Sequence, residues 1–420
     1  MIFESFVEAE SIFLWATFAL AIVLGAAANK TNFCTMGAVS DWVNMGDLGR
    51  IRAWLLAIAV AMLGVVILEY MGLVNAGAAF PPYRASQLIW AENLLGGVLF
   101  GIGMTLASGC GNKTLVRIGG GNFKSIIVLA VIGVIAYYMT NPFPDTDKTL
   151  FSVLFYDWIR PLAISTTNGQ DLGSLINPAN ALLTRLIIGI VLAVAFLVFV
   201  FKSADFRSNR DNIMGGLIVG LVVLGGWYVS SNVQVNVDDQ AYSLGKYYGE
   251  WDMVADSDKG KPAVGAPLSP QSFTFINPMG QTYGYLTKGM KRSMMTFGIA
   301  ALLGVIVGSF FWALVTKSLR FEWFVSIKDF VTHVTGAVLM GFGGVLALGC
   351  TIGQGITGVS TLAVGSFLAL IAIVFGSALT MKVQYYKLVY EEEASFVKAL
   401  VAGLADMKLL PNSLRKLDAV

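Results

Sequence analysis

The feature of this sequence that most constrains its fold is a series of long apolar segments. Nine runs, each close to the roughly 20 residues that a helix needs to cross a bilayer, cover about 11–28, 53–71, 92–107, 124–140, 182–201, 212–230, 293–316, 330–347 and 361–380. Only 13% of the 420 residues are charged, whereas about 25% is usual in a soluble protein. The sequence therefore predicts an all-α polytopic membrane protein embedded in a lipid bilayer.

The charged residues predict how these segments are oriented. The N-terminus carries Glu4, Glu8 and Glu10 rather than a basic signal sequence, so we expect it to face outward. With that orientation, 18 of the 28 Lys and Arg residues fall in inner loops and the C-terminal tail. Cytoplasmic loops are generally rich in basic residues, so the distribution predicts an outer N-terminus and an inner C-terminus.

The nine segments divide the chain into four regions. A single span separates two sets of four spans, so the second set is inverted relative to the first. The predicted regions are a first membrane repeat (1–140), an outer loop with the linking helix (141–211), a second, inverted repeat with a long outer loop at 231–276 (212–381), and an inner tail (382–420).

An internal repeat supports this division. The segment GGVLFGIGMTLASGC (96–110) aligns with GAVLMGFGGVLALGC (336–350), and nine of the fifteen positions are identical, including four glycines and the final cysteine. Inverted repeats in membrane proteins are characteristic of transporters, whose binding sites lie near the midplane between the repeats. The small-residue spacings Gly97-x3-Gly101 and Ala337-x3-Gly341 predict close helix packing.

Each of the three cysteines begins a segment that is too short and too polar to span. These segments are CTMGAVSDWV (34–43), CGNKTLVRIGG (110–120) and CTIGQGITGVS (350–360). Irregular backbone at membrane depth is tolerated only where it is buried in protein or lines a cavity. We therefore expect short re-entrant helices here, with a fourth at Asn277–Gly289 by symmetry.

The starts of these helices predict an anion site. Four helix N-termini meeting at one point supply about two positive charges, since each contributes roughly half a charge, and that total suits a small dianion. Thiols are soft and polarizable, so they favour an anion with an exposed sulfur or selenium atom. The predicted substrate-binding residues are Cys34, Cys110, Cys350, Gly109, Gly111, Asn112, Lys113, Thr351, Gly353, Gln354, Asn32, Thr35 and Asn277.

The composition also excludes several classes of function. A single histidine, His333, and three cysteines leave little for a zinc or haem site or for a disulfide framework. The net charge of +2 gives no reason to expect a nucleic-acid partner. Because no general base accompanies any cysteine, we expect that the protein is not an enzyme. The sequence thus predicts a protein without a cofactor or metal.

Three motifs carry a family resemblance. NFCTMG (32–37), ASGCGNKT (107–114) and ALGCTIGQGITG (347–358) resemble the YeeE/YedE sulfur-transport family of bacterial inner-membrane proteins. The resemblance implies an hourglass-shaped fold of nine spanning and four short helices, with a periplasmic N-terminus and a cytoplasmic C-terminus. It also implies uptake of thiosulfate, which would pass between the thiols of Cys34, Cys110 and Cys350. A small cytoplasmic sulfur-carrier protein is the implied partner.

Two other functions remain open from the residues. One is transport of a selenium-containing or other sulfur oxyanion, which differs only in the cargo. The other is a membrane sulfurtransferase, in which a cysteine attacks the sulfane sulfur and holds a persulfide. Relay of a dianion needs protonated thiols, because a thiolate would repel it, and apolar surroundings favour the protonated form.

Overall fold

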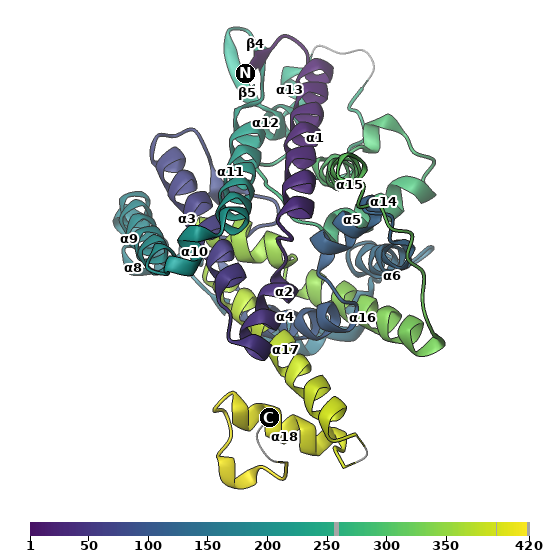
Figure 1. Ribbon diagram of the computed structural model, residues 1–420. Coiled ribbons are helices and arrows are strands. Elements are labelled where there is room, and N and C mark those ends of the chain that lie inside the picture. Colours follow the sequence, from purple (N-terminus) through teal and green to yellow (C-terminus); the bar gives the residue numbers. More distant parts are fainter. Residues whose placement is uncertain (256–259, 392, 418–420) are drawn as a thin grey trace.

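The computed structural model describes residues 1–255, 260–391 and 393–417, and it is built almost entirely from helices (Figure 1). Among these residues, nine candidate spans are long and apolar enough to cross a membrane. The long helices are α1 (Phe6–Lys30), α3 (Gly49–Tyr70), α4 (Trp90–Leu106), α6 (Phe123–Thr140), α9 (Ala181–Phe201), α11 (Arg210–Asn232), α15 (Phe297–Val315), α16 (Ile327–Leu346) and α17 (Val364–Val389). The prediction of an all-α polytopic fold with nine spans is confirmed.

Polar side chains mark the starts of several long helices. Ser5 caps α1, Asn122 caps α6, Thr296 caps α15 and Ser326 caps α16, each accepting a hydrogen bond from a backbone N–H of the first turn. The first N–H groups of a helix have no partner inside the helix, and a capping oxygen satisfies one of them. These residues therefore fix where the apolar segments become helical.

Two helix boundaries differ from those that hydropathy predicts. Helix α15 begins at Phe297 rather than 293, because residues Arg292–Met294 form a separate 3-10 turn. Helix α17 continues to Val389, well beyond 380, because its last turns pack against α18 (Phe396–Asp406) instead of facing lipid. There Tyr386 is buried, and its hydroxyl donates to Asp406 Oδ2 at 3.0 Å.

Short helical elements interrupt the long ones at the predicted places. They are α2 (Thr35–Ser40) with a π-helical turn (Asp41–Met45), α5 (Gly111–Gly119), α14 (Ile276–Thr287) and a π-helical turn (Gly353–Gly358). When only these short elements and the long helices are counted, each half of the chain has the order long, short, long, long, short, long. Helix α9 lies between the two halves. The inverted relation of the halves, the re-entrant path of these elements and the hourglass shape stay predictions.

Glycines allow the central helices to pack closely. Helix α4 contacts both α16 and α17, while α1 packs on α15 and α3 on α11. A Cβ atom added at Gly96 or Gly103 of α4 would lie 2.5 or 2.6 Å from backbone atoms near or within α16. One added at Gly97 or Gly101 would meet α17 at 2.6 or 2.2 Å. The predicted close packing through small residues is therefore present.

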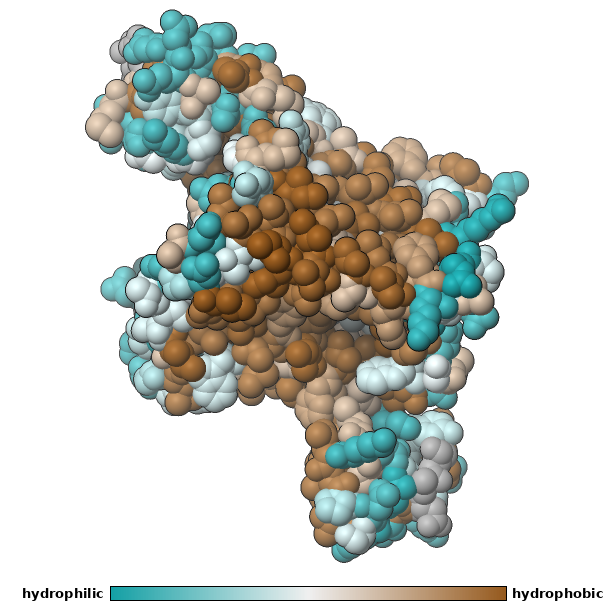
Figure 2. Space-filling view, turned by 90° about the vertical axis from the view of Figure 1, so that its left-hand side faces the viewer, coloured by the Kyte–Doolittle hydropathy of each residue, from teal (hydrophilic) through white to brown (hydrophobic). Residues whose placement is uncertain are grey.

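Polar regions cover the two ends of the helical bundle. Figure 2 shows a broad hydrophobic surface between hydrophilic regions at the top and bottom of the molecule. The N-terminal strand β1 (Ile2–Phe3) and the C-terminal helix α18 lie at opposite ends of the molecule (Figure 1), as an odd number of spans requires. The strands are β1, parallel to β4 (Gln234–Val237), which pairs antiparallel with β5 (Gln240–Ser243), and the antiparallel pair β2 (Gln87–Leu88) and β3 (Ile164–Ser165).

The long polar segments contain short helices. Segment 141–181 holds α7 (Asp157–Ile159) and α8 (Leu172–Ile176), and segment 231–276 holds α12 (Leu244–Gly249) and α13 (Trp251–Val254). A further short helix, α10 (Ala204–Ser208), joins α9 to α11. Segment 141–181 is anchored in the core, because Leu172 N–H donates to Leu362 O and Val364 N–H donates to Gln170 O.

Candidate functional site

The three cysteines stand at the starts of short helical elements inside the bundle. Cys34 is the N-cap of α2, Cys110 is the N-cap of α5, and Cys350 immediately precedes the helical turn that leads into Gly353–Gly358. Their relative exposures are 5%, 1% and 0%. All three cysteines are therefore enclosed by protein.

A shared backbone feature places these thiols. The residue two positions before each cysteine has a positive φ: 50° at Asn32, 59° at Ser108 and 58° at Leu348. After Ser108 and Leu348, the next amide donates to the carbonyl five residues earlier at 2.8 Å, which ends the long helix. Left-handed backbone is unfavourable for residues with a Cβ, so the surrounding packing imposes this turn before each thiol.

Two of the three thiols lie side by side, and the third begins a neighbouring segment. The side chains of Cys34 and Cys110 contact each other, and the Cys110 thiol also contacts the side chain of Thr351. The backbone of Lys113 lies beside the Cys110 sulfur. Because Thr351 follows Cys350 directly in the chain, Cys110 contacts both Cys34 and the segment that begins at Cys350.

The fourth short helix joins these segments through residues just before it. The Cys350 sulfur accepts a hydrogen bond from the backbone N–H of Gly353 at 3.4 Å, and it also lies beside the backbone of Phe275 and the side chain of Thr274. Thr274 stands 240 residues after Cys34, the same separation as between Cys110 and Cys350. The pair Thr274–Cys350 thus repeats the pair Cys34–Cys110.

Sequence reasoning missed Thr274. The available signal was the register of 240 residues that aligns the two cysteine segments, which places Thr274 opposite Cys34. A register of 243 places Asn277 there instead. Asn277 is half-buried in the first turn of α14, and its side chain makes no hydrogen bond within the described part of the chain.

Unsatisfied polar atoms gather beside the thiols. Buried polar groups in proteins are normally hydrogen-bonded. Within the described residues, five buried oxygens in these segments have no hydrogen-bond partner: Thr35 Oγ1, Asn112 Oδ1, Thr274 Oγ1, Thr351 Oγ1 and Gln354 Oε1. The three hydroxyls can donate to an anion. This cluster is the arrangement expected of a site that receives a polar ligand.

Glycines bring the short helices together at this site. A Cβ at Gly353 would lie 2.3 Å from Thr274 Oγ1, so a larger residue could not occupy this position without moving Thr274. A Cβ at Gly111 would lie 3.2 Å from Ile276 Cδ1, which places the start of α5 against the start of α14. The predicted residue Gly109 packs instead against the aliphatic part of Lys113.

The predicted residue Gln354 has a structural contact as well as a free oxygen. Its Nε2 donates to the carbonyl of Ala347, the residue that ends α16. This bond holds the amide beside the turn around Cys350, while Oε1 stays without a partner among the described residues. Gln354 therefore helps to set the geometry of the turn.

A basic cavity adjoins the segments that begin at Cys34 and Cys110. Its volume is about 580 Å³, and its ionisable lining consists of Lys30, Lys113, Arg117, Arg320 and Glu322. Asn32 also lines it, and the Nζ of Lys113 donates to Asn32 Oδ1 at 3.3 Å. An excess of positive charge in a concave surface raises the local concentration of anions. The predicted residues Asn32 and Lys113 thus lie where this cavity meets the thiols.

Buried thiols and unsatisfied hydroxyls enclosed by hydrophobic helices suit the passage of a small polar solute through a membrane. The fold and site thereby define a multi-pass membrane protein of the transporter class.

Comparison with known sequences specifies the family. The chain belongs to the sulphur transport family, whose model matches residues 30–379. It is 23% identical over 372 residues to the thiosulfate transporter TsuA of Escherichia coli (strain K12), covering 84% of this chain and 90% of that protein. It is 24% identical over 373 residues to the thiosulfate transporter TsuA of Spirochaeta thermophila, covering 87% and 97%. The resemblance to the YeeE/YedE family is confirmed, and the chain is a membrane transporter for sulfur.

Proposed function

We propose that this protein imports thiosulfate across the bacterial inner membrane along Cys350, Cys110 and Cys34. The observation that carries the proposal is the contact of Cys34 with Cys110, together with the contact of Cys110 with Thr351, the residue after Cys350. The substrate names of the two TsuA relatives support the choice of anion.

The chemistry of the site matches the two ends of thiosulfate. A thiol is a weak hydrogen-bond donor and a soft group, so it suits the terminal sulfur of the anion. The oxygen end finds hydroxyl donors at Thr35, Thr274 and Thr351. Backbone N–H groups and the positive ends of the helix dipoles stabilise the negative charge. Protonated thiols let the anion pass without forming a covalent bond, so no enzymatic step is needed.

The direction of transport follows from the proposed orientation. With a periplasmic N-terminus and a cytoplasmic C-terminus, Cys350 faces the outer end of the path, and the basic cavity opens at the cytoplasmic end. Electrostatic attraction in that cavity draws the anion away from Cys34. A small cytoplasmic sulfur-carrier protein would then accept the sulfur.

Growth on thiosulfate tests this function. In a strain that depends on thiosulfate as its sulfur source, the Cys110→Ala variant should fail to support growth, because the central thiol is missing. The control is Thr105→Ser on the preceding helix, which keeps the hydroxyl that is 2.8 Å from Ser377 Oγ and should grow normally. Undiminished growth of Cys110→Ala would refute the proposed path.

Competition identifies the cargo. Unlabelled thiosulfate should suppress uptake of radiolabelled thiosulfate more strongly than sulfate, selenite or selenosulfate does. Stronger suppression by a selenium anion would assign the transporter to selenium instead. A stable persulfide on any of the three cysteines during turnover, detected by mass spectrometry, would indicate a sulfurtransferase.

A further inference from the structure

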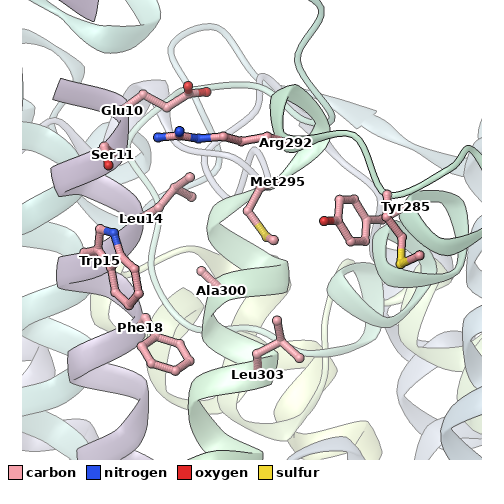
Figure 3. A pocket seen from close by; sticks show the side chains of 11 residues that line it. Glu10, Ser11, Leu14, Trp15, Phe18, Tyr285, Arg292, Met295, Ala300 and Leu303 are labelled. Atoms are coloured by element: carbon pink, nitrogen blue, oxygen red, sulfur yellow. The ribbon is translucent and has the colours of Figure 1, made fainter. Parts of the chain in front are cut away.

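A second candidate binding site lies away from the thiols, in a groove between α1 and α15. The groove has a volume of about 470 Å³, within the roughly 300–1,000 Å³ typical of ligand pockets. The segment that joins α14 to α15 closes one side (Figure 3). Its lining residues are Glu10, Ser11, Leu14, Trp15, Phe18, Tyr285, Met290, Arg292, Met295, Ala300 and Leu303.

The groove changes from charged to apolar along its length. Figure 3 shows Glu10 and Arg292 at one end, and Phe18 and Leu303 at the other. Glu10 and Phe18 are eight residues apart on α1, which corresponds to about 12 Å at the helical rise of 1.5 Å per residue. A ligand that follows the groove must therefore have a polar end and an apolar chain.

The groove is accessible from the side of the helical bundle. Trp15 is 65% exposed and Leu303 is 41% exposed on the surfaces of the two spanning helices. Tryptophan is enriched where a membrane meets water. The charged end of the groove thus lies near the level of the lipid headgroups, and the apolar end lies deeper in the bilayer.

The two charges at the polar end of the groove, Glu10 and Arg292, face each other without forming a direct ion pair. The Arg292 side chain extends toward the Glu10 carboxylate (Figure 3) and interacts with it electrostatically. Within the described residues, neither side chain forms an ion pair or hydrogen bond. Two opposite charges that line the same space without forming an ion pair can bind a zwitterionic group.

We propose that this groove binds a phospholipid whose headgroup carries a phosphate and a primary ammonium, as phosphatidylethanolamine does. Arg292 binds the phosphate, a geometry for which guanidinium groups are well suited, and Glu10 accepts hydrogen bonds from the ammonium. One acyl chain lies along Leu14, Phe18 and Leu303. The bound lipid bridges the two halves of the chain, because α1 belongs to the first and α15 to the second.

Lipid binding to the purified full-length protein tests this site. Native mass spectrometry would measure the retention of phosphatidylethanolamine, phosphatidylcholine and phosphatidylglycerol with identical acyl chains. Phosphatidylethanolamine should bind best, because the quaternary amine of phosphatidylcholine cannot donate to Glu10 and phosphatidylglycerol has no cation. The Glu10→Gln and Arg292→Gln variants should each weaken its binding about tenfold, the factor that corresponds to about 1.4 kcal/mol.

Neighbouring residues provide matched controls. Glu8 and Lys291 are exposed, carry the same charges and lie outside the groove, so Glu8→Gln and Lys291→Gln should leave lipid binding unchanged. Ala300→Phe should reduce binding of all three lipids by filling the groove. Equal retention of phosphatidylglycerol and phosphatidylethanolamine would overturn the proposal, as would an equal loss of binding in the two control variants.

Discussion

At the scale of single residues, the Thr351 hydroxyl can be tested for a role in transport without a loss of stability. It is fully buried, and its oxygen has no hydrogen-bond partner among the described residues. Replacing it by a methyl group in Thr351→Val therefore removes only its contact with the Cys110 thiol. We expect the melting temperature to stay the same or rise, while thiosulfate uptake falls.

Thr357 is the matched control for this substitution. Its hydroxyl, in the same short segment, donates to Phe273 O at 2.7 Å. Thr357→Val leaves that buried carbonyl unsatisfied and should lower the free energy of unfolding by about 1–3 kcal/mol. Both variants would be measured by thermal unfolding in detergent and by uptake assays. A lower melting temperature for Thr351→Val than for Thr357→Val would contradict the functional role of the Thr351 hydroxyl.

A buried ion-pair cluster gives a second residue-scale prediction. Arg84 Nη2 donates to Glu69 Oε2 at 2.9 Å, and Arg185 lies 3.7 Å from the same carboxylate. Arg185 keeps its contact with Asp171, but Glu69→Gln leaves the buried Arg84 guanidinium without its counter-charge, which should cost about 3–5 kcal/mol. Thermal unfolding would show a large drop for Glu69→Gln and almost none for the exposed Glu8→Gln. Equal melting temperatures would contradict the structural role of the cluster.

Most residues of the candidate site could be predicted from the sequence because the cysteine motifs repeat. The contact of Cys34 with Cys110 could not, since it depends on how α2 and α5 meet in space. Thr274 escaped detection because a threonine is a poor sequence match for a cysteine, even though the register of 240 residues pointed to it. The cluster around Glu69 was equally hidden, because Arg84 and Arg185 come from a loop and a separate helix.

At the scale of elements, hydropathy located the spans well because lipid solvation imposes about 20 apolar residues on each. It misplaced the end of α17, where protein contacts with α18 replace lipid. The anchoring of Leu172 and Gln170 against the start of α17 also lay beyond prediction, since these are backbone hydrogen bonds between segments distant in sequence.

The crossing of α4 and α16 gives an element-scale prediction. A Cβ at Gly103 would lie 2.6 Å from Gly336 O, so Gly103→Ala must push the helices apart. We expect a loss of about 1–3 kcal/mol in the free energy of unfolding, the usual cost of overpacking. Gly249→Ala is the control, because an added Cβ there meets nothing within 4 Å. Thermal unfolding of both variants measures the difference, and similar melting temperatures would argue against close packing here.

At the scale of the whole molecule, the proposed orientation can be tested by cysteine labelling. The three native cysteines are buried, so they give little background. Asp147 and Lys328 are exposed in segments on opposite sides of the proposed topology. A membrane-impermeant maleimide applied to intact cells should label Asp147→Cys but not Lys328→Cys. Labelling of Lys328→Cys alone would mean that the protein has the reverse orientation.

The central claim is that a soft anion crosses this membrane protein along buried thiols. The most direct test is uptake of radiolabelled thiosulfate into proteoliposomes that contain the wild-type protein or Cys110→Ser. Serine keeps a hydrogen-bond donor of similar size but removes the soft sulfur. We predict uptake by the wild-type protein and at least about a tenfold loss in Cys110→Ser, equivalent to about 1.4 kcal/mol. Equal uptake by the two proteins would contradict the account.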